Sequence, residues 1–416
     1  MMKFKISYTF PSRLRLDYDS FVALFLNLSM VFQFLGAIVT LLLGAVPGWF
    51  TSIQKAAVAA FLLAAVVVLF VRGAFLLLLG GSALWLALHL ASYFIEPRIT
   101  ILLVRIVIYS YGYVFLTACL MARIKEPDAF VRAMKPYILI TLPYALVQLL
   151  VFRKTGLYSM PFSYATAPLA ILCLLLGKKE KKYYLFFLLI AFVDLICGSR
   201  GCFLCFVFAI LLSELMQGKR GYRVLALALL ALAFLIVLVN VRAIAGLALR
   251  FLPNSRTIQL LAAGELHLSG RDVYYSHLLG IARDSGFAPH GLYSDRFVMA
   301  SHHGRYSMEE IFGSYAHNFM IEVLFQFGWM GIPLLILFFL SLLASYGRVK
   351  RSRAEGWIQV WIMAVSFAMG QLLVSSSYLT AISFGLILGV MLLSRRIPAN
   401  GRIRLSFDRG RKVGIS

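Results

Sequence analysis

Residues 317–345 read HNFMIEVLFQFGWMGIPLLILFFLSLLAS, and Glu322 is the one Asp, Glu, Lys or Arg among them. A helix needs about 20 predominantly apolar residues to cross the hydrocarbon core of a bilayer. The stretch therefore predicts one membrane-spanning helix that opens at His317 and Asn318. Steps of four and three residues from His317 reach Ile321, Leu324, Gly328 and Gly331. These positions share a helix face, where the two glycines favour close approach of another helix.

The rest of the chain is apolar in the same way. Of its 416 residues, 61% are hydrophobic and 14% are charged, whereas soluble domains carry about a quarter charged residues. We therefore predict an all-α, polytopic integral membrane protein in which residues 1–416 form a single membrane domain. About twelve transmembrane helices are expected, at residues 21–43, 55–71, 74–95, 101–122, 136–152, 163–177, 183–197, 201–216, 222–242, 318–345, 357–376 and 377–394.

Lysine and arginine indicate the orientation of these spans. They gather in alternate connections and in the tail at residues 395–416, and cytoplasmic segments of membrane proteins carry such an excess. We expect both the N- and C-termini to be cytoplasmic, with the basic tail close to anionic lipid. The net charge of +23 then reflects membrane sorting, and we expect no nucleic-acid partner.

One connection is much longer than the others. Residues 243–317, between the ninth and tenth spans, form a predicted periplasmic or extracellular loop that holds all but one of the seven histidines. A structureless loop of this length is uncommon unless it is functional. We expect short helices within it, for example at residues 273–282, lying on the outer membrane surface. His302 and His303 are expected to be a solvated pair rather than metal ligands.

A second feature faces the same side, where Cys197-Gly198-Ser199-Arg200-Gly201-Cys202 joins two short apolar runs. Arg200 is expected slightly below the outer interface, where a cation is costly without a partner or a role. Asp194 is the nearest acidic candidate. The alternative is an ordinary helical hairpin whose arginine reaches the lipid headgroups. The five cysteines lack the CxxC spacing of metal or redox sites, and a Cys197–Cys202 disulfide stays an open alternative.

Arg200, Arg271 and His317 are thus all predicted on the outer face. Arginine binds phosphate oxygens with two hydrogen bonds and keeps its charge. A neutral histidine accepts a proton from an attacking hydroxyl near neutral pH. Together the three residue types suit a substrate with a diphosphate headgroup and a lipid tail.

The same residues carry a resemblance to a known family. The chain resembles the O-antigen ligase and O-antigen polymerase family, bacterial membrane glycosyltransferases that assemble surface polysaccharides. The matching motifs are Ser199-Arg200-Gly201, Ser269-Gly270-Arg271, and His317-Asn318 followed by Gly328 and Gly331. Their order, spacing and sidedness match over residues 183–340, and the first 180 residues match only as apolar spans.

The resemblance implies a reaction at the outer face of a bacterial cell membrane. An oligosaccharide would move from undecaprenyl diphosphate to an acceptor glycan hydroxyl, with inversion and without metal or other cofactor. His317, Arg200 and Arg271 would be catalytic. Ser199, Gly201, Gly270, Asn318 and Glu322 would bind substrate, although Asn318 and Glu322 equally suit an interhelical hydrogen bond. Membrane lipid, a flippase and a chain-length regulator are the expected partners.

Other functions remain open at this stage. We favour a polymerase because polymerases of the family occur with and without an outer membrane, whereas an O-antigen ligase needs a lipid A core acceptor. A lipid-linked oligosaccharide flippase or another twelve-span transporter is the alternative from a different class. Such proteins usually have two similar halves, and the sequence has no internal repeat. Arg105 and Asp194 are the few deep ionisable candidates for a transport cavity.

Overall fold

A computed structural model of the chain describes residues 17–155, 159–197, 200–217 and 271–397, together with residues 246, 249, 259, 262 and 263. All elements in these ranges are helical, which confirms the predicted all-α class. The first half contains α1 (Tyr18–Leu43), α2 (Gly48–Val71), α3 (Phe75–Ile95), η1 (Pro97–Leu102), α4 (Leu103–Ile106), η2 (Val107–Leu116), α5 (Thr117–Ala122), α6 (Pro127–Thr155), α7 (Met160–Leu176), α8 (Lys182–Cys197) and α9 (Arg200–Gln217).

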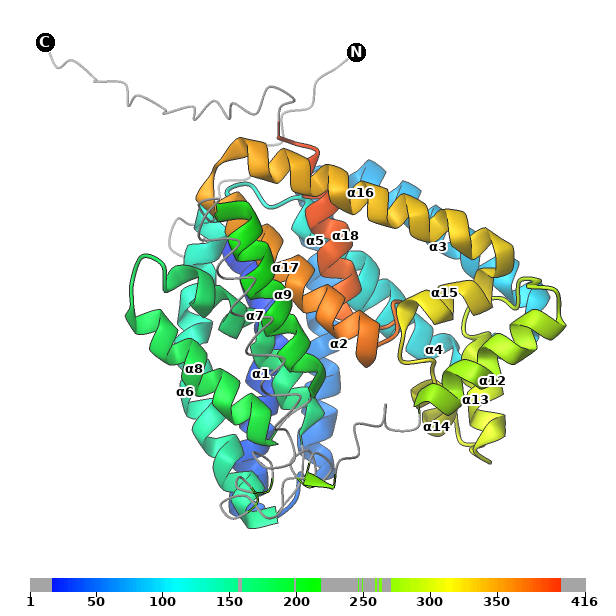
Figure 1. Cartoon of the computed structure of the whole chain (residues 1–416), viewed down its shortest axis with the longest axis horizontal. Coiled ribbons are helices and arrows are strands. Elements are labelled where there is room, and N and C mark those ends of the chain that lie inside the picture. Colours follow the sequence, from blue (N-terminus) through cyan, green and yellow to red (C-terminus); the bar gives the residue numbers. More distant parts are fainter. Residues whose placement is uncertain are drawn as a thin grey trace, which may run out of the picture.

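The second half begins with three helices of the predicted outer loop. They are followed by the last long helices of the bundle (Figure 1). The elements are α12 (Arg271–Asp284), α13 (Ser294–His302), α14 (Met308–Gly313), α15 (Phe319–Phe327), η3 (Gly328–Met330), α16 (Gly331–Ser352), α17 (Glu355–Val374) and α18 (Ile382–Ser394). α12 confirms the helix expected at residues 273–282.

Seven helical segments in the described residues are long and apolar enough to cross a membrane. They cover Tyr18–Leu43, Gly48–Val71, Phe75–Ile95, Pro97–Ala122, Pro127–Thr155, Phe319–Ser352 and Glu355–Val374. α7, α9 and α18 are apolar but shorter. Helices thus lie over eleven of the twelve predicted spans, and the ninth, at 222–242, lies outside the described residues, as do most of residues 243–270 and the tail from residue 398. The chain is a helical membrane protein.

Helix α17 forms the centre of the bundle. It packs against α9, α7, α6 and α18 (Figure 1), and most of its side chains are buried. Gly370 brings it close to α9, because a Cβ there would touch the backbone and sulfur of Cys205. By contrast, α2 and α3 leave most of their apolar side chains exposed, as expected for helices that face lipid.

The connections that the charge pattern predicts to be cytoplasmic meet at one end of the bundle. The Arg123 side chain donates to the Gly73 carbonyl at 3.2 Å, and the Arg72 guanidinium lies over the Tyr18 ring. Lys179 pairs with Glu355 at 2.5 Å. We call this end, with residues 17–19, 72–73, 123–128, 178–182 and 353–356, the basic end.

The prediction of one continuous helix through Gly328 and Gly331 is wrong at Gly328. α15 ends at Phe327, Gly328 has φ +56°, and α16 starts at Gly331. A Cβ at Gly328 would collide with the Phe287 carbonyl. The glycine therefore does permit a close approach, but by the backbone of the preceding loop rather than by a second helix. The chain bends there instead of continuing straight through the predicted span.

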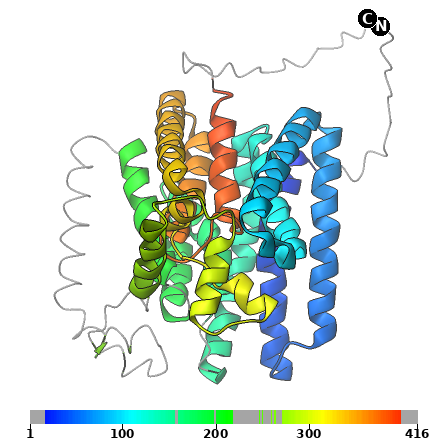
Figure 2. The same ribbon diagram turned by 90° about the vertical axis from the view of Figure 1, so that its right-hand side faces the viewer.

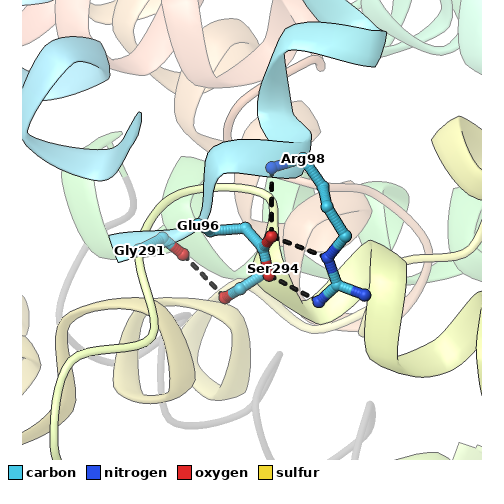
Figure 3. Close-up of polar contacts among 4 residues, drawn as sticks. All are labelled: Glu96, Arg98, Gly291 and Ser294. Carbon is cyan, nitrogen blue, oxygen red and sulfur yellow. Dashed lines mark hydrogen bonds and ion pairs between the residues drawn. The ribbon is translucent and has the colours of Figure 1, made fainter. Parts of the chain in front are cut away.

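The three described helices of the predicted outer loop, α12, α13 and α14, pack against the bundle beside α15 (Figures 1 and 2). Their expected position on the outer membrane surface stays a prediction. The Leu292 N–H donates to Ser92 Oγ of α3 at 3.1 Å. Beside it, Ser294 Oγ donates to the Gly291 carbonyl at 2.7 Å, and Arg98 binds Glu96 at 2.6 and 2.7 Å (Figure 3). The Leu292 bond joins the segment before α13 to the end of α3, whereas the Ser294 and Arg98 bonds are local to each segment.

Candidate functional site

His317 lies at the start of α15, as the sequence predicts, and its backbone is unusual. Its φ is +57°, a left-handed conformation that non-glycine residues adopt rarely. The next residue, Asn318, caps α15, since its side-chain oxygen accepts from Met320 N at 3.0 Å and Ile321 N at 3.3 Å. The Asn318 amide also donates to the Leu373 carbonyl at 3.1 Å. Asn318 thereby ties the tip of α15 to the end of α17.

Tyr315 places the imidazole of His317. The two ring centroids are 4.2 Å apart, and the Tyr315 hydroxyl donates to the Ser375 carbonyl at 2.8 Å. The Arg296 guanidinium lies over the same phenol ring, with Cζ 5.1 Å from its centroid. The His317 ring thus packs against the Tyr315 ring, and Tyr315 is hydrogen bonded to the end of α17.

The first arginine motif lies at the start of α9, beside the end of α17. α9 begins at Arg200, and a Cβ added to Gly201 would touch Tyr164 Oη, a methyl of Val374 and Ser375 Oγ. The glycine is therefore needed for α9 to start against the end of α17. Ser199 and the side chain of Arg200 lie outside the described parts of the structure.

The second arginine motif also meets His317. α12 begins at Arg271, and Tyr274, one turn later, stacks on the His317 ring with centroids 6.2 Å apart. Gly270 and the Arg271 side chain fall outside the described residues. The described parts of the three motifs, at Gly201, Arg271 and His317, nevertheless lie beside Ser375, Tyr274 and Tyr315 respectively.

Glu322 has contacts that fit the interhelical interpretation. It is completely buried and accepts hydrogen bonds from Ser377 Oγ and from Tyr378 N, the latter at 3.2 Å. Gln326 Nε2 lies 3.4 Å from the same carboxylate. Glu322 therefore holds α15 to the connection between α17 and α18.

Asp295 and Arg296 are buried residues that the sequence reasoning missed. Asp295 accepts from Ala316 N at 3.2 Å and from Gln326 Nε2 at 2.7 Å, and burial raises the pKa of its carboxyl. Arg296 donates to the Phe312 carbonyl and is fully buried. Together they hold the segment 312–316 that leads to His317. In the sequence, Asp295 and Arg296 stand out only as an adjacent acid and base in a polar loop. That pattern does not predict that the two side chains are buried.

Other candidate groups lie away from His317 or are paired. Arg105 is not in a central cavity, because it faces the loop helix α14 and lies 3.9 Å from Glu309. Asp194 accepts from Thr166 at 3.2 Å and from the Cys202 thiol at 3.5 Å. All five cysteines are free, so no Cys197–Cys202 disulfide forms.

The Asp-x-Asp sequence of the chain, at residues 17–19, lies far from the site. It is at the basic end, where Asp19 binds Lys125 N and Glu126 N, both at 3.1 Å. The described residues contain no group of three or more His, Cys, Asp or Glu side chains that could hold a metal ion.

The loop histidines His277, His302 and His303 form a cluster beside the site, in which His277 is half-buried and the other two are exposed. The rings of His277 and His302 are 4.3 Å apart, and those of His302 and His303 are 5.0 Å apart. Tyr274 connects this cluster to His317, since its ring also lies 4.9 Å from that of His303. Partial desolvation, and then the neighbouring Arg305, lower the pKa of His303.

A cavity of about 450 Å³ adjoins Tyr315. Residues of α1, η2, α6, α7, α17, α18 and the connection between α17 and α18 line it. Tyr164 and Ser375, which contact Gly201, belong to its wall. The meeting point of the motifs therefore borders a space large enough for a small ligand.

Comparisons of the chain with protein-family models, with curated proteins and with solved structures found no match.

Proposed function

We propose that this chain is a membrane glycosyltransferase of the O-antigen ligase and polymerase type. One observation carries the proposal: α12, which begins at Arg271, contacts His317 through Tyr274, and the start of α9 at Arg200 is linked to His317 through Ser375 and Tyr315, beside a cavity. An arginine at each helix start and a histidine between them suit transfer from a diphosphate-linked donor. The left-handed backbone of His317 adds support, because strained conformations gather at functional sites.

In the proposed reaction, an acceptor sugar hydroxyl attacks the anomeric carbon of an oligosaccharide on undecaprenyl diphosphate. The new bond joins the acceptor oxygen to that carbon, and the bond between the carbon and the diphosphate oxygen breaks. His317 takes the hydroxyl proton. Negative charge develops on the leaving diphosphate, and Arg200 and Arg271 stabilise it. Displacement from the opposite face inverts the anomeric centre, and no metal takes part.

The proposed topology has twelve spans, with residues 222–242 as the ninth. The basic end faces the cytoplasm of a bacterial cell, and His317 faces outward. Cysteines placed at positions 199, 271 and 317 in a cysteine-free background should react with an impermeant maleimide from the outside. Reaction of any of them from the cytoplasmic side alone would remove the proposed site.

The activity is tested with purified protein and purified lipid-linked oligosaccharide in detergent. Conversion to a longer or transferred glycan without any ion gradient is expected from an enzyme. A transporter would leave the substrate chemically unchanged, and that result would reject the proposal.

We propose a polymerase rather than a ligase as the specific reaction. A clean deletion of the gene should then leave single repeat units on the surface or on the carrier. Full-length polymer that stays on undecaprenyl diphosphate would instead assign a ligase, whose acceptor is lipid A core.

A further inference from the structure

The cavity beside Tyr315 is lined by apolar side chains and by uncharged polar ones. No Asp, Glu, Lys, Arg or His is among the described residues that line it. Serine and threonine hydroxyls line one side, at Ser375, Ser376, Ser377 and Thr380 in the connection between α17 and α18. A diphosphate is a poor fit for such a wall, because burying its charge without a cation is costly.

Gln371 gives the cavity an unsatisfied acceptor. This residue of α17 lines the cavity and is 9% exposed. Its side-chain oxygen is buried and has no hydrogen-bond partner in the described residues. Buried polar groups are nearly always hydrogen bonded. A ligand or a water molecule is therefore expected to donate a hydrogen bond to the amide oxygen of Gln371.

Aromatic rings complete the wall. Tyr109, Tyr113, Tyr164 and Tyr315 all line the cavity, and the Tyr109 and Tyr113 rings lie 5.4 Å apart. Such side chains combine an apolar face with a hydroxyl. A sugar ring has the complementary pattern, with C–H groups on its faces and hydroxyls around its edge.

We propose that this cavity binds an uncharged, hydroxyl-bearing sugar unit of the glycan substrate, with a hydroxyl donating to Gln371 Oε1. The proposal rests on the proposed function for the identity of the glycan. The diphosphate stays outside the cavity, near the starts of α9 and α12. An isoprenoid tail is the less suitable occupant, because it would leave the Gln371 amide unpaired.

Binding is measured without turnover through a thiol at the cavity rim. Met160 lines the cavity at the start of α7 and is partly exposed, so Met160→Cys should react with N-ethylmaleimide. The five native thiols are buried and serve as the background. Two probes are compared: the oligosaccharide released by mild acid from the organism's own lipid-linked donor, and undecaprenyl phosphate.

The free oligosaccharide should slow the labelling of the introduced thiol in Met160→Cys at least tenfold at saturation, and undecaprenyl phosphate should not. Protection by undecaprenyl phosphate alone would make the cavity a lipid site and overturn the proposal. Protection by neither probe would also overturn it.

A matched pair of variants assigns the contact to Gln371. Gln371→Leu keeps the size but removes the amide, and should weaken protection by the oligosaccharide about tenfold. Gln359→Leu is the control, because Gln359 lies on the same helix, is buried, and binds Glu355 at 2.9 Å instead of lining the cavity. Equal protection in the two leucine variants would contradict the role of Gln371.

The same variants separate the two sources of the sugar. The free oligosaccharide lacks the diphosphate leaving group, so it acts only as an acceptor. A raised KM for this acceptor in Gln371→Leu, with an unchanged KM for the lipid-linked donor, assigns the acceptor glycan; the reverse assigns the donor glycan. His317→Ala should abolish transfer but leave protection intact. Protection in a protein without transferase activity would reject the proposed function while the sugar site stands.

Discussion

The imidazole of His317 and the phenol of Tyr315 pack against each other with centroids 4.2 Å apart and ring planes tilted by 43°, and the Tyr315 hydroxyl is itself hydrogen bonded to the Ser375 carbonyl. Ser375 also contacts Gly201 at the start of α9. Gly201 and Tyr315, which are more than a hundred residues apart in sequence, therefore both contact Ser375 at the end of α17. The direction of the His317 ring depends on this support, so substitutions at Tyr315 should act on the same chemistry as substitutions at His317.

His317→Ala should reduce transfer by about 10²–10⁴-fold, the usual effect of losing a general base. Expression and melting temperature should change little, since His317 is only partly buried. His302→Ala is the control, because His302 is an exposed member of the neighbouring histidine cluster. Near-normal transfer by His317→Ala would leave His317 as a helix-entry residue only.

Tyr315→Phe and Tyr315→Leu separate the ring of Tyr315 from its hydroxyl. Phenylalanine keeps the ring contact with His317 but loses the hydrogen bond to Ser375, and such a bond typically contributes about 1 kcal/mol. Leucine loses both contacts, so its kcat should fall at least tenfold below that of the phenylalanine variant. Equal kcat values in the two variants would show that the contact with the ring at position 315 does not orient His317.

Arg200→Lys and Arg271→Lys should each retain little transfer, because lysine keeps the charge but loses the two-pronged hydrogen bonding to phosphate. Arg98→Lys is the matched control, since Arg98 binds Glu96 and lies over Phe297, away from Tyr315. Transfer should be the same in EDTA as with added Mg²⁺. A strict requirement for a divalent metal would contradict the arginine account.

Gly328→Ala should lower the melting temperature and the yield of folded protein. Its φ of +56° disfavours any L side chain, and the added Cβ would collide with the Phe287 carbonyl. Gly347→Ala is the control, because a Cβ there meets nothing within 4 Å in the same long helical segment. An unchanged melting temperature for Gly328→Ala would mean that the bend between α15 and α16 is not required.

The histidine cluster should make stability weakly dependent on pH. Desolvation lowers the pKa of His277 and His303, so the folded state favours their neutral forms. The unfolded state then binds more protons as the pH falls below about 6.5, the ordinary value for histidine. The melting temperature should therefore decrease slightly between pH 7.5 and pH 5.5. The double variant His277→Gln/His303→Gln should flatten this slope; an identical slope would assign it to other groups.

The sequence alone determined that this is a helical membrane protein, because long apolar runs have few alternatives in a bilayer. It also placed His317 at a helix start, and it gave the order of the Arg200, Arg271 and His317 motifs. It did not predict the break at Gly328, because glycine is compatible with both a close helix contact and a left-handed bend.

Only the tertiary structure decided what surrounds His317. Burial of Asp295, Arg296 and Glu322 depends on contacts between α13, α15 and the connection after α17, which no local pattern encodes. The same holds for the uncharged cavity, whose wall combines residues from eight parts of the chain, including Tyr315 before α15. Periodicity reports which residues share one helix face, whereas long-range packing determines which faces meet.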